Sequence, residues 1–185
     1  NKKSRLIPFQ YSSDQDYVIE SGEHYFRLYD NSGALLEDTV TKLLTHCNGV
    51  DGSLEIQDSG NTGHIVTQVG TATLSLAQAK FGLASLLLDG DSDYLTVPDH
   101  ADWEFAAGDW SVDFWVRFVS TVGQQSLMMH SNAATNIYWH LYKDGTNKLV
   151  VVFFDGALKG YFVTTAAATL VNDTWYHMAF VRNGV

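Results

Sequence analysis

Four aspartates lie in segments that predict turns, and they could supply the oxygen atoms that a calcium ion needs. Asp58 begins the segment Asp-Ser-Gly-Asn, and Asp89, Asp91 and Asp93 alternate along Asp-Gly-Asp-Ser-Asp. Calcium takes about six to eight oxygen ligands from carboxylates, carbonyls and amide side chains, which loops supply easily. The competing interpretation is turn geometry alone, because Asp beside Gly favours tight turns. Calcium is therefore the cofactor that the sequence suggests, with the turn interpretation left open.

Four other residues carry the prediction of a ligand-binding site: Trp103, Tyr138, Trp139 and His140. Sugar recognition needs an exposed aromatic face beside polar hydrogen-bonding groups. Trp103 follows a polar segment that predicts a surface loop, whereas Tyr138 and His140 flank Trp139 and would face the opposite side of a strand. Plain packing in the core is the alternative for each tryptophan.

The histidines show no spacing typical of catalysis or metal binding. Seven of them are scattered along the chain, without a His-Glu-x-x-His segment or a paired Cys/His spacing. A Ser-His-Asp triad is compatible with the sequence, but no Gly-x-Ser-x-Gly segment supports one. We interpret His177 as a packed, hydrogen-bonded structural residue.

Composition and charge narrow the class of protein and its partners. The chain of 185 residues is 45% hydrophobic and 17% charged, which is typical of a globular protein. Its formal net charge of −10 disfavours a nucleic acid or an anionic membrane as the main partner. No apolar run reaches the roughly 18 residues of a membrane span, and the polar first residues show no signal peptide. The single cysteine, Cys47, forbids a disulfide within the chain.

Alternating apolar residues and Asp-Gly or Asn-Gly pairs predict strands joined by tight turns. Apolar side chains occupy every second position of segment 112–118, so one face of this strand should be buried. Segments 137–142 and 149–154 predict a hairpin, and 159–164 should add a third strand. The one expected helix is short, over 74–80. Strands at this spacing indicate an all-β fold, an antiparallel β-sandwich or jelly roll.

Three segments, in this order, resemble the LamG-like, concanavalin A-type jelly-roll family of lectins and glucanases. They are residues 81–98, residues 110–117 (Trp-Ser-Val-Asp-Phe-Trp-Val-Arg) and residues 175–184 (Trp-Tyr-His-Met-Ala-Phe-Val-Arg-Asn-Gly). The resemblance implies a LamG-like domain over 41–185. It also implies a calcium ion near the rim of the sandwich, which LamG-like domains often bind. The carboxylate pattern of the glucanases, Glu-x-Asp-x-x-Glu, does not occur in the chain, so we expect no enzyme activity.

The resemblance has two further implications. Trp110, Trp115 and Trp175 lie within its segments, so we expect them in the core or barely exposed. The hairpin and return strands that follow the third segment in the family are absent after Val185. We therefore expect a domain that is incomplete at its C-terminus. Its open sheet edge would be covered by the N-terminal hairpin or by a second chain, as a homo-oligomer or strand-exchanged dimer.

Residues 1–40 predict a separate β-hairpin segment, with a boundary near residues 38–41. The segments 5–9 (Arg-Leu-Ile-Pro-Phe), 17–20 and 25–29 resemble part of bacteriophage tail proteins. The two resemblances predict a non-catalytic recognition or adhesion module of a phage tail or other virion surface protein, located on the virion or extracellularly. Its rim loops would bind a glycan or a host-surface protein. The alternative is a purely structural module of the tail assembly that makes protein–protein contacts, and a hydrolase ranks last.

Overall fold

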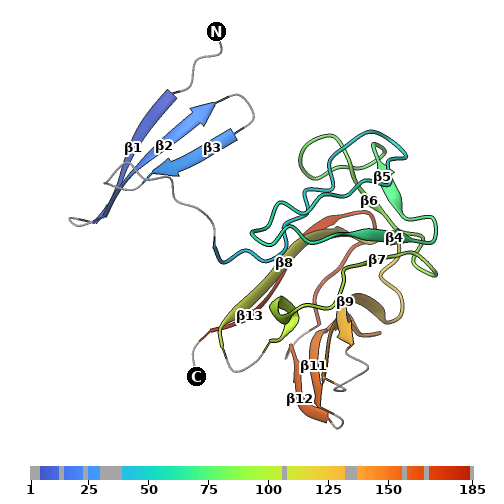
Figure 1. Ribbon diagram of the computed structural model, residues 1–185. Helices are drawn as coiled ribbons and strands as arrows, with labels where there is room; N and C mark the ends of the chain where they lie inside the picture. The colour runs from blue at the N-terminus through green and yellow to red at the C-terminus, as the bar shows by residue number, and fades with distance from the viewer. Residues whose placement is uncertain are drawn as a thin grey trace. The chain divides into compact units, whose positions relative to one another are not determined.

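The chain forms two compact units in the computed structural model, which describes residues 5–12, 15–22, 25–29, 39–105, 108–131, 137–155, 158–164 and 167–183 (Figure 1). The first unit comprises residues 1–44 and 59–63, and the second comprises residues 45–58 and 64–185. The sequence did not suggest that 59–63 would group with the N-terminal residues. The predicted division into 1–40 and 41–185 stays a prediction.

The first unit contains an antiparallel sheet of three strands in the order β1–β2–β3 (Figure 1). These strands are β1 (Arg5–Ser12), β2 (Gln15–Gly22) and β3 (Tyr25–Tyr29). Ile7 pairs with Ile19 across β1 and β2, and Ile19 pairs with Leu28 across β2 and β3. The predicted N-terminal hairpin is therefore present as β1 and β2, and β3 pairs with β2 as a third strand.

The second unit is built from antiparallel strands, with a single turn of 3-10 helix among its described residues. Four strands form the sheet β12–β11–β10–β9, and the others pair as β13–β8, β4–β7 and β5–β6. The elements are β4 (Thr67–Val69), β5 (Thr73–Ser75), β6 (Ser85–Leu87), β7 (Tyr94–Thr96), η1 (Ala101–Trp103), β8 (Trp110–Arg117), β9 (Gln125–Ser131), β10 (Ile137–Lys143), β11 (Leu149–Asp155), β12 (Leu158–Val163) and β13 (Trp175–Arg182).

The main core lies between the β8–β13 pair and the four-stranded sheet, as expected for a β-sandwich. Met178 and Phe180 of β13 belong to one buried cluster with Trp139 and Leu141 of β10. Phe114 of β8 packs against the same cluster. Period-two alternation in β8 explains this packing, because every second side chain of a strand points to the same face. The predicted all-β antiparallel sandwich is confirmed.

A second, smaller core lies beneath the loops that connect the short strands. Ile56, Leu74 and Ala84 are its buried members. The predicted helix over 74–80 is wrong, because Thr73–Ser75 forms β5 and pairs with β6. Leu74 is buried in this strand, and burial against neighbouring strands outweighs the weak helix preference of a short segment. No helix among the described residues has the length and apolarity that crossing a membrane requires.

Candidate functional site

The outward face of the β8–β13 pair carries an exposed aromatic side chain surrounded by polar ones. The strands pair so that Trp115 lies opposite His177, and Asp113 lies opposite Ala179. Trp115 is 39% exposed although its neighbour Phe114 points into the core. The expectation that Trp115 is buried or barely exposed is therefore corrected. Its place on the outer face follows from the same alternation that buries Phe114.

Two residues of the loop before β6 contact the Trp115 indole. The Lys80 ammonium lies 4.1 Å from the centroid of the ring, which is cation–π geometry. The Phe81 ring meets the indole edge-on, with 5.6 Å between the centroids. Phe81 is itself well exposed, so the two aromatic side chains form one apolar surface that solvent reaches.

A hydrogen-bonded pair lies next to this aromatic surface. His177 Nε2 is 2.8 Å from Asp113 Oδ2, and both side chains are about half exposed or more. His177 is therefore hydrogen-bonded as expected, but the expectation that it is packed is corrected. The His177 ring also lies beside Trp115, at 5.3 Å between the centroids. An exposed indole flanked by imidazole and carboxylate groups can stack on an apolar ligand face and hydrogen-bond its polar edge. We call these five residues (Lys80, Phe81, Asp113, Trp115, His177) the outer platform.

The structure corrects the expectation that Trp139 presents a ligand-binding face. Trp139 is 4% exposed and stacks on Phe105, with 4.5 Å between the ring centroids and 7° between the planes. Its indole Nε1 donates to the carbonyl of Trp103 at 2.8 Å. This buried tryptophan satisfies its N–H and fills the core, so the packing alternative describes it.

The other predicted ligand-binding residues lie on η1 and β10. Trp103 lies in η1, where its Nε1 donates to the Pro98 carbonyl at 2.9 Å, and it packs half-buried against the core. His140 is on the face of β10 opposite Trp139, and its Nε2 is 2.7 Å from Ser126 Oγ. Burial lowers the pKa of His140, so the ring favours its neutral form. Tyr138 lies in β10, but its side chain is outside the described residues.

The carboxylates proposed for calcium hold their own loops together. Asp89 Oδ1 accepts the backbone N–H groups of Asp91 and Asp93, at 2.8 and 3.0 Å, which lowers the pKa of Asp89. Asp93 accepts the backbone N–H and the hydroxyl of Thr71, and so joins the turn before β5 to the loop before β7. Asp58 Oδ2 accepts the His64 backbone N–H at 2.7 Å. These bonds are what the turn interpretation requires, and calcium at these loops stays a prediction.

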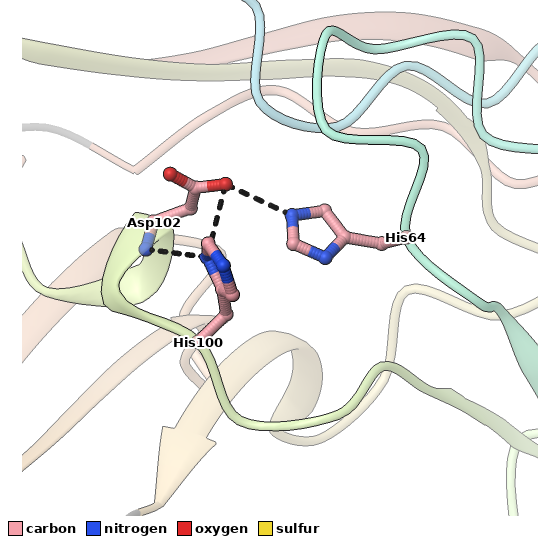
Figure 2. A group of neighbouring side chains, drawn as sticks. All are labelled: His64, His100 and Asp102. Atoms are coloured by element: carbon pink, nitrogen blue, oxygen red, sulfur yellow. Dashed lines mark hydrogen bonds and ion pairs between the residues drawn. The ribbon is translucent and has the colours of Figure 1, made fainter.

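The structure brings together three side chains that the sequence did not group. Figure 2 shows Asp102 Oδ2 facing both His64 and His100, at 3.0 Å from His64 Nε2 and 3.1 Å from His100 Nδ1. In the described part of the chain, this is the one group of at least three His, Cys, Asp or Glu side chains whose ligand atoms lie within 4.8 Å of one another. His64 also packs on Trp103, with 4.5 Å between the ring centroids.

Sequence spacing contained only part of the signal for this cluster. His100 and Asp102 are two residues apart, but His64 comes from a loop 36 positions before His100, and only the fold brings the loops together. For the outer platform, the alternation in 112–118 puts Trp115 on the face of β8 that Phe114 does not share, although the family resemblance led us to expect a buried Trp115. The alternation did not reveal that the loop carrying Lys80 and Phe81 would fold beside Trp115.

Comparison with known proteins gives one family match. The family model described as the concanavalin A-like lectin/glucanases superfamily (Laminin_G_3) matches residues 89–185, which include β8, β13 and the sheet β9–β12. No curated protein and no solved structure matches the chain.

Proposed function

This chain belongs to the concanavalin A-like lectin/glucanases superfamily, and we propose that it is a non-catalytic recognition module that binds a glycan on the outer platform. The observation that carries the proposal is the exposure of Trp115 beside a hydrogen-bonded histidine and carboxylate. A pyranose ring offers an apolar C–H face for the indole and hydroxyl groups for the polar neighbours. The absence of the Glu-x-Asp-x-x-Glu pattern supports the non-catalytic assignment.

The outer platform supports this role better than the rim loops that the sequence suggested. Trp139 is in the core, and the Trp103 indole is engaged by Pro98 and His64. Trp115 needs no rearrangement of the core to meet a ligand. The Lys80 side chain lies across its ring, and an exposed cation–π contact is worth about 0.5–1 kcal/mol. A ligand can therefore displace Lys80 at small cost.

For the biological setting we propose a phage tail or another virion surface protein, located on the virion or outside the cell. The resemblance of the N-terminal strands to tail proteins supports this setting. The ligand would then be a glycan of the host surface. A homo-oligomer or a strand-exchanged dimer stays a prediction for the assembled protein.

The first experiment is a glycan array with the full chain, run with calcium and again with EDTA. A selective hit supports the proposal, and dependence on calcium would additionally support an ion at the loops of Asp58 or Asp89. The hit is then titrated by calorimetry with Trp115→Ala and with Trp103→Phe. We expect Trp115→Ala to weaken binding at least about tenfold, because burying one aromatic side chain is worth about 1.5–3 kcal/mol. Trp103→Phe should bind like the parent.

Lys80→Ala identifies the chemistry of the ligand. With a neutral sugar, removing the ammonium from the indole should strengthen binding by about two- to fivefold, the equivalent of about 0.5–1 kcal/mol. With an acidic sugar the same change should weaken binding, because the positive charge is lost. A blank array, or binding that survives Trp115→Ala and fails with Trp103→Phe, would refute the outer platform as the site.

A second candidate is a structural module of the tail assembly that makes only protein–protein contacts. The observation that favours it is the exposure of apolar side chains on both faces of β1, where Leu6 is 66% exposed and the next residue, Ile7, is also exposed. A three-stranded sheet of this size is marginal alone and needs a neighbour to pack on. A Leu6→Ser, Ile7→Ser variant that alters the mass measured by light scattering would support this candidate.

A further inference from the structure

We propose that His64, His100 and Asp102 bind a zinc ion, at a site separate from the outer platform and independent of glycan binding. The three ligand atoms are His64 Nε2, His100 Nδ1 and Asp102 Oδ2 (Figure 2). Two imidazole nitrogens and one carboxylate oxygen form a donor set that zinc accepts, and three protein ligands leave one position for water or another ligand. Calcium prefers an all-oxygen set, so this is not the calcium site that the sequence suggested.

The distances between the ligand atoms fit one small cation. Zinc binds nitrogen and oxygen at about 2.0–2.2 Å, so two ligand atoms of a tetrahedral site lie roughly 3.3 Å apart. Asp102 Oδ2 is 3.0 Å from His64 Nε2 and 3.1 Å from His100 Nδ1. The third pair, between the two nitrogens, lies within 4.8 Å. These distances are compatible with three atoms at three corners of a tetrahedron around one ion.

The hydrogen bonding of His100 shows which contact zinc would replace. His100 precedes η1, and its Nδ1 accepts the Asp102 backbone N–H at 3.2 Å. Nδ1 has a single lone pair, so zinc bound to this atom takes the place of that backbone N–H. The Asp102 carboxylate oxygen, 3.1 Å from Nδ1, favours a positive charge at this point, and the ion supplies it.

The surroundings hold the ligands in place and leave an entry path. The His64 side chain is only 6% exposed, and it is fixed by Asp58, which binds its backbone N–H, and by Trp103, which packs on its ring. Asp102 is also largely buried. His100 is 46% exposed, so an ion can reach the cluster from this side. Because two of the three ligand side chains are already held in place, binding of the ion costs little side-chain conformational entropy.

The test uses the full chain, stripped of metal with a chelator and dialysed. Zinc is titrated against a chromophoric zinc indicator, and the zinc-loaded protein is measured by X-ray absorption spectroscopy. We expect one zinc ion per chain with two imidazole ligands and further oxygen ligands. His100→Asn and Asp102→Asn should each weaken binding by more than the roughly 10–100-fold that loss of a supporting partner costs. His46→Asn, which removes an exposed histidine outside the cluster, should leave the affinity unchanged.

His100→Asn is the decisive variant because an amide oxygen can still cap η1, and circular dichroism should confirm that the variant folds. The proposal would be overturned if the parent and His100→Asn bound zinc with the same affinity. It would also be overturned by an X-ray absorption spectrum without imidazole ligands, or if His46→Asn weakened zinc binding as much as His100→Asn. A parent protein with no affinity for zinc is the remaining outcome, and it would overturn the proposal and assign the cluster to loop stability alone.

Discussion

Replacement of the buried Lys143 by Met should destabilise the sandwich. Lys143 ends β10 and its side chain is fully buried, with 0% exposure. Its ammonium shares three N–H donors among four nearby oxygen atoms: Thr121 O at 3.0 Å, Gly123 O at 2.6 Å, Asp144 O at 3.2 Å and Asn147 Oδ1 at 2.9 Å. The amine therefore joins the loop before β9 to the turn between β10 and β11.

The cost follows from the acceptors that lose their donor. An ammonium has three hydrogens, so three hydrogen bonds disappear, and each buried acceptor left without a partner costs about 1–3 kcal/mol. Some of these loop carbonyls can turn toward water, so we take the lower end for each. The expected loss for Lys143→Met is therefore about 3 kcal/mol of unfolding free energy. Met has a similar length and leaves no large cavity.

Urea denaturation followed by tryptophan fluorescence measures this loss. The matched control is Lys148→Met in the same turn, a half-buried lysine for which we expect a change below about 1 kcal/mol. Equal, small effects of both substitutions would refute the role assigned to the Lys143 ammonium. A smaller slope of the unfolding free energy against urea concentration would indicate instead that the variant no longer unfolds in one step.

The burial of Lys143 also predicts how the effect of Lys143→Met depends on pH. Burial lowers the pKa of Lys143 below its usual value of 10.5, and the nearby Asp144 carboxylate opposes the shift. Between the two pKa values the unfolded chain binds more protons than the folded one, so the unfolding free energy contributed by Lys143 rises with pH in this window. The difference between parent and Lys143→Met should therefore grow as the pH is raised toward 10.5. A difference that shrinks would contradict the sign.

Two further predictions concern the loops and the core. The backbone N–H groups of Asp91 and Asp93 lower the pKa of Asp89 below its usual 3.8, so the stability that Asp89 contributes is present above pH 3.8 and is lost as the pH falls through the lower, folded value. The amide chemical shifts of Asp91 and Asp93 should report this transition, and a midpoint at or above 3.8 would contradict it. Trp139→Phe should lower the unfolding free energy by about 2 kcal/mol, because it removes the indole bond to the Trp103 carbonyl and leaves a small cavity. Thermal denaturation measures the loss, and an unchanged midpoint would argue against a buried Trp139.

The strands of the second unit could be predicted because each has a local cause. Alternation in 112–118 and the Asp-Gly turn after 137–142 specify a face and a hairpin without knowledge of the rest of the chain. The helix prediction for segment 74–80 was wrong because a short apolar run is compatible with both helix and strand. Only the pairing with β6, which is not local, decides for β5. The same reason separates the two candidate sites: the position of Trp115 is local, whereas the neighbourhoods of Lys80 and His64 are not.

Trp115 and Trp139 show why residue type alone could not locate the binding surface. Both are strand tryptophans with aromatic or histidine neighbours, yet Trp139 faces Phe105 in the core and Trp115 faces solvent. An indole satisfies its N–H either by a buried carbonyl, as Trp139 does, or by water, as an exposed indole can. What distinguishes them is the layer on the other side of the strand. β10 has the β8–β13 pair packed over its Trp139 face, whereas the outer face of β8 is contacted at Trp115 by the exposed Lys80 side chain. An exposed, charged side chain is a cover that a ligand can displace, and this is the physical reason for placing recognition at Trp115.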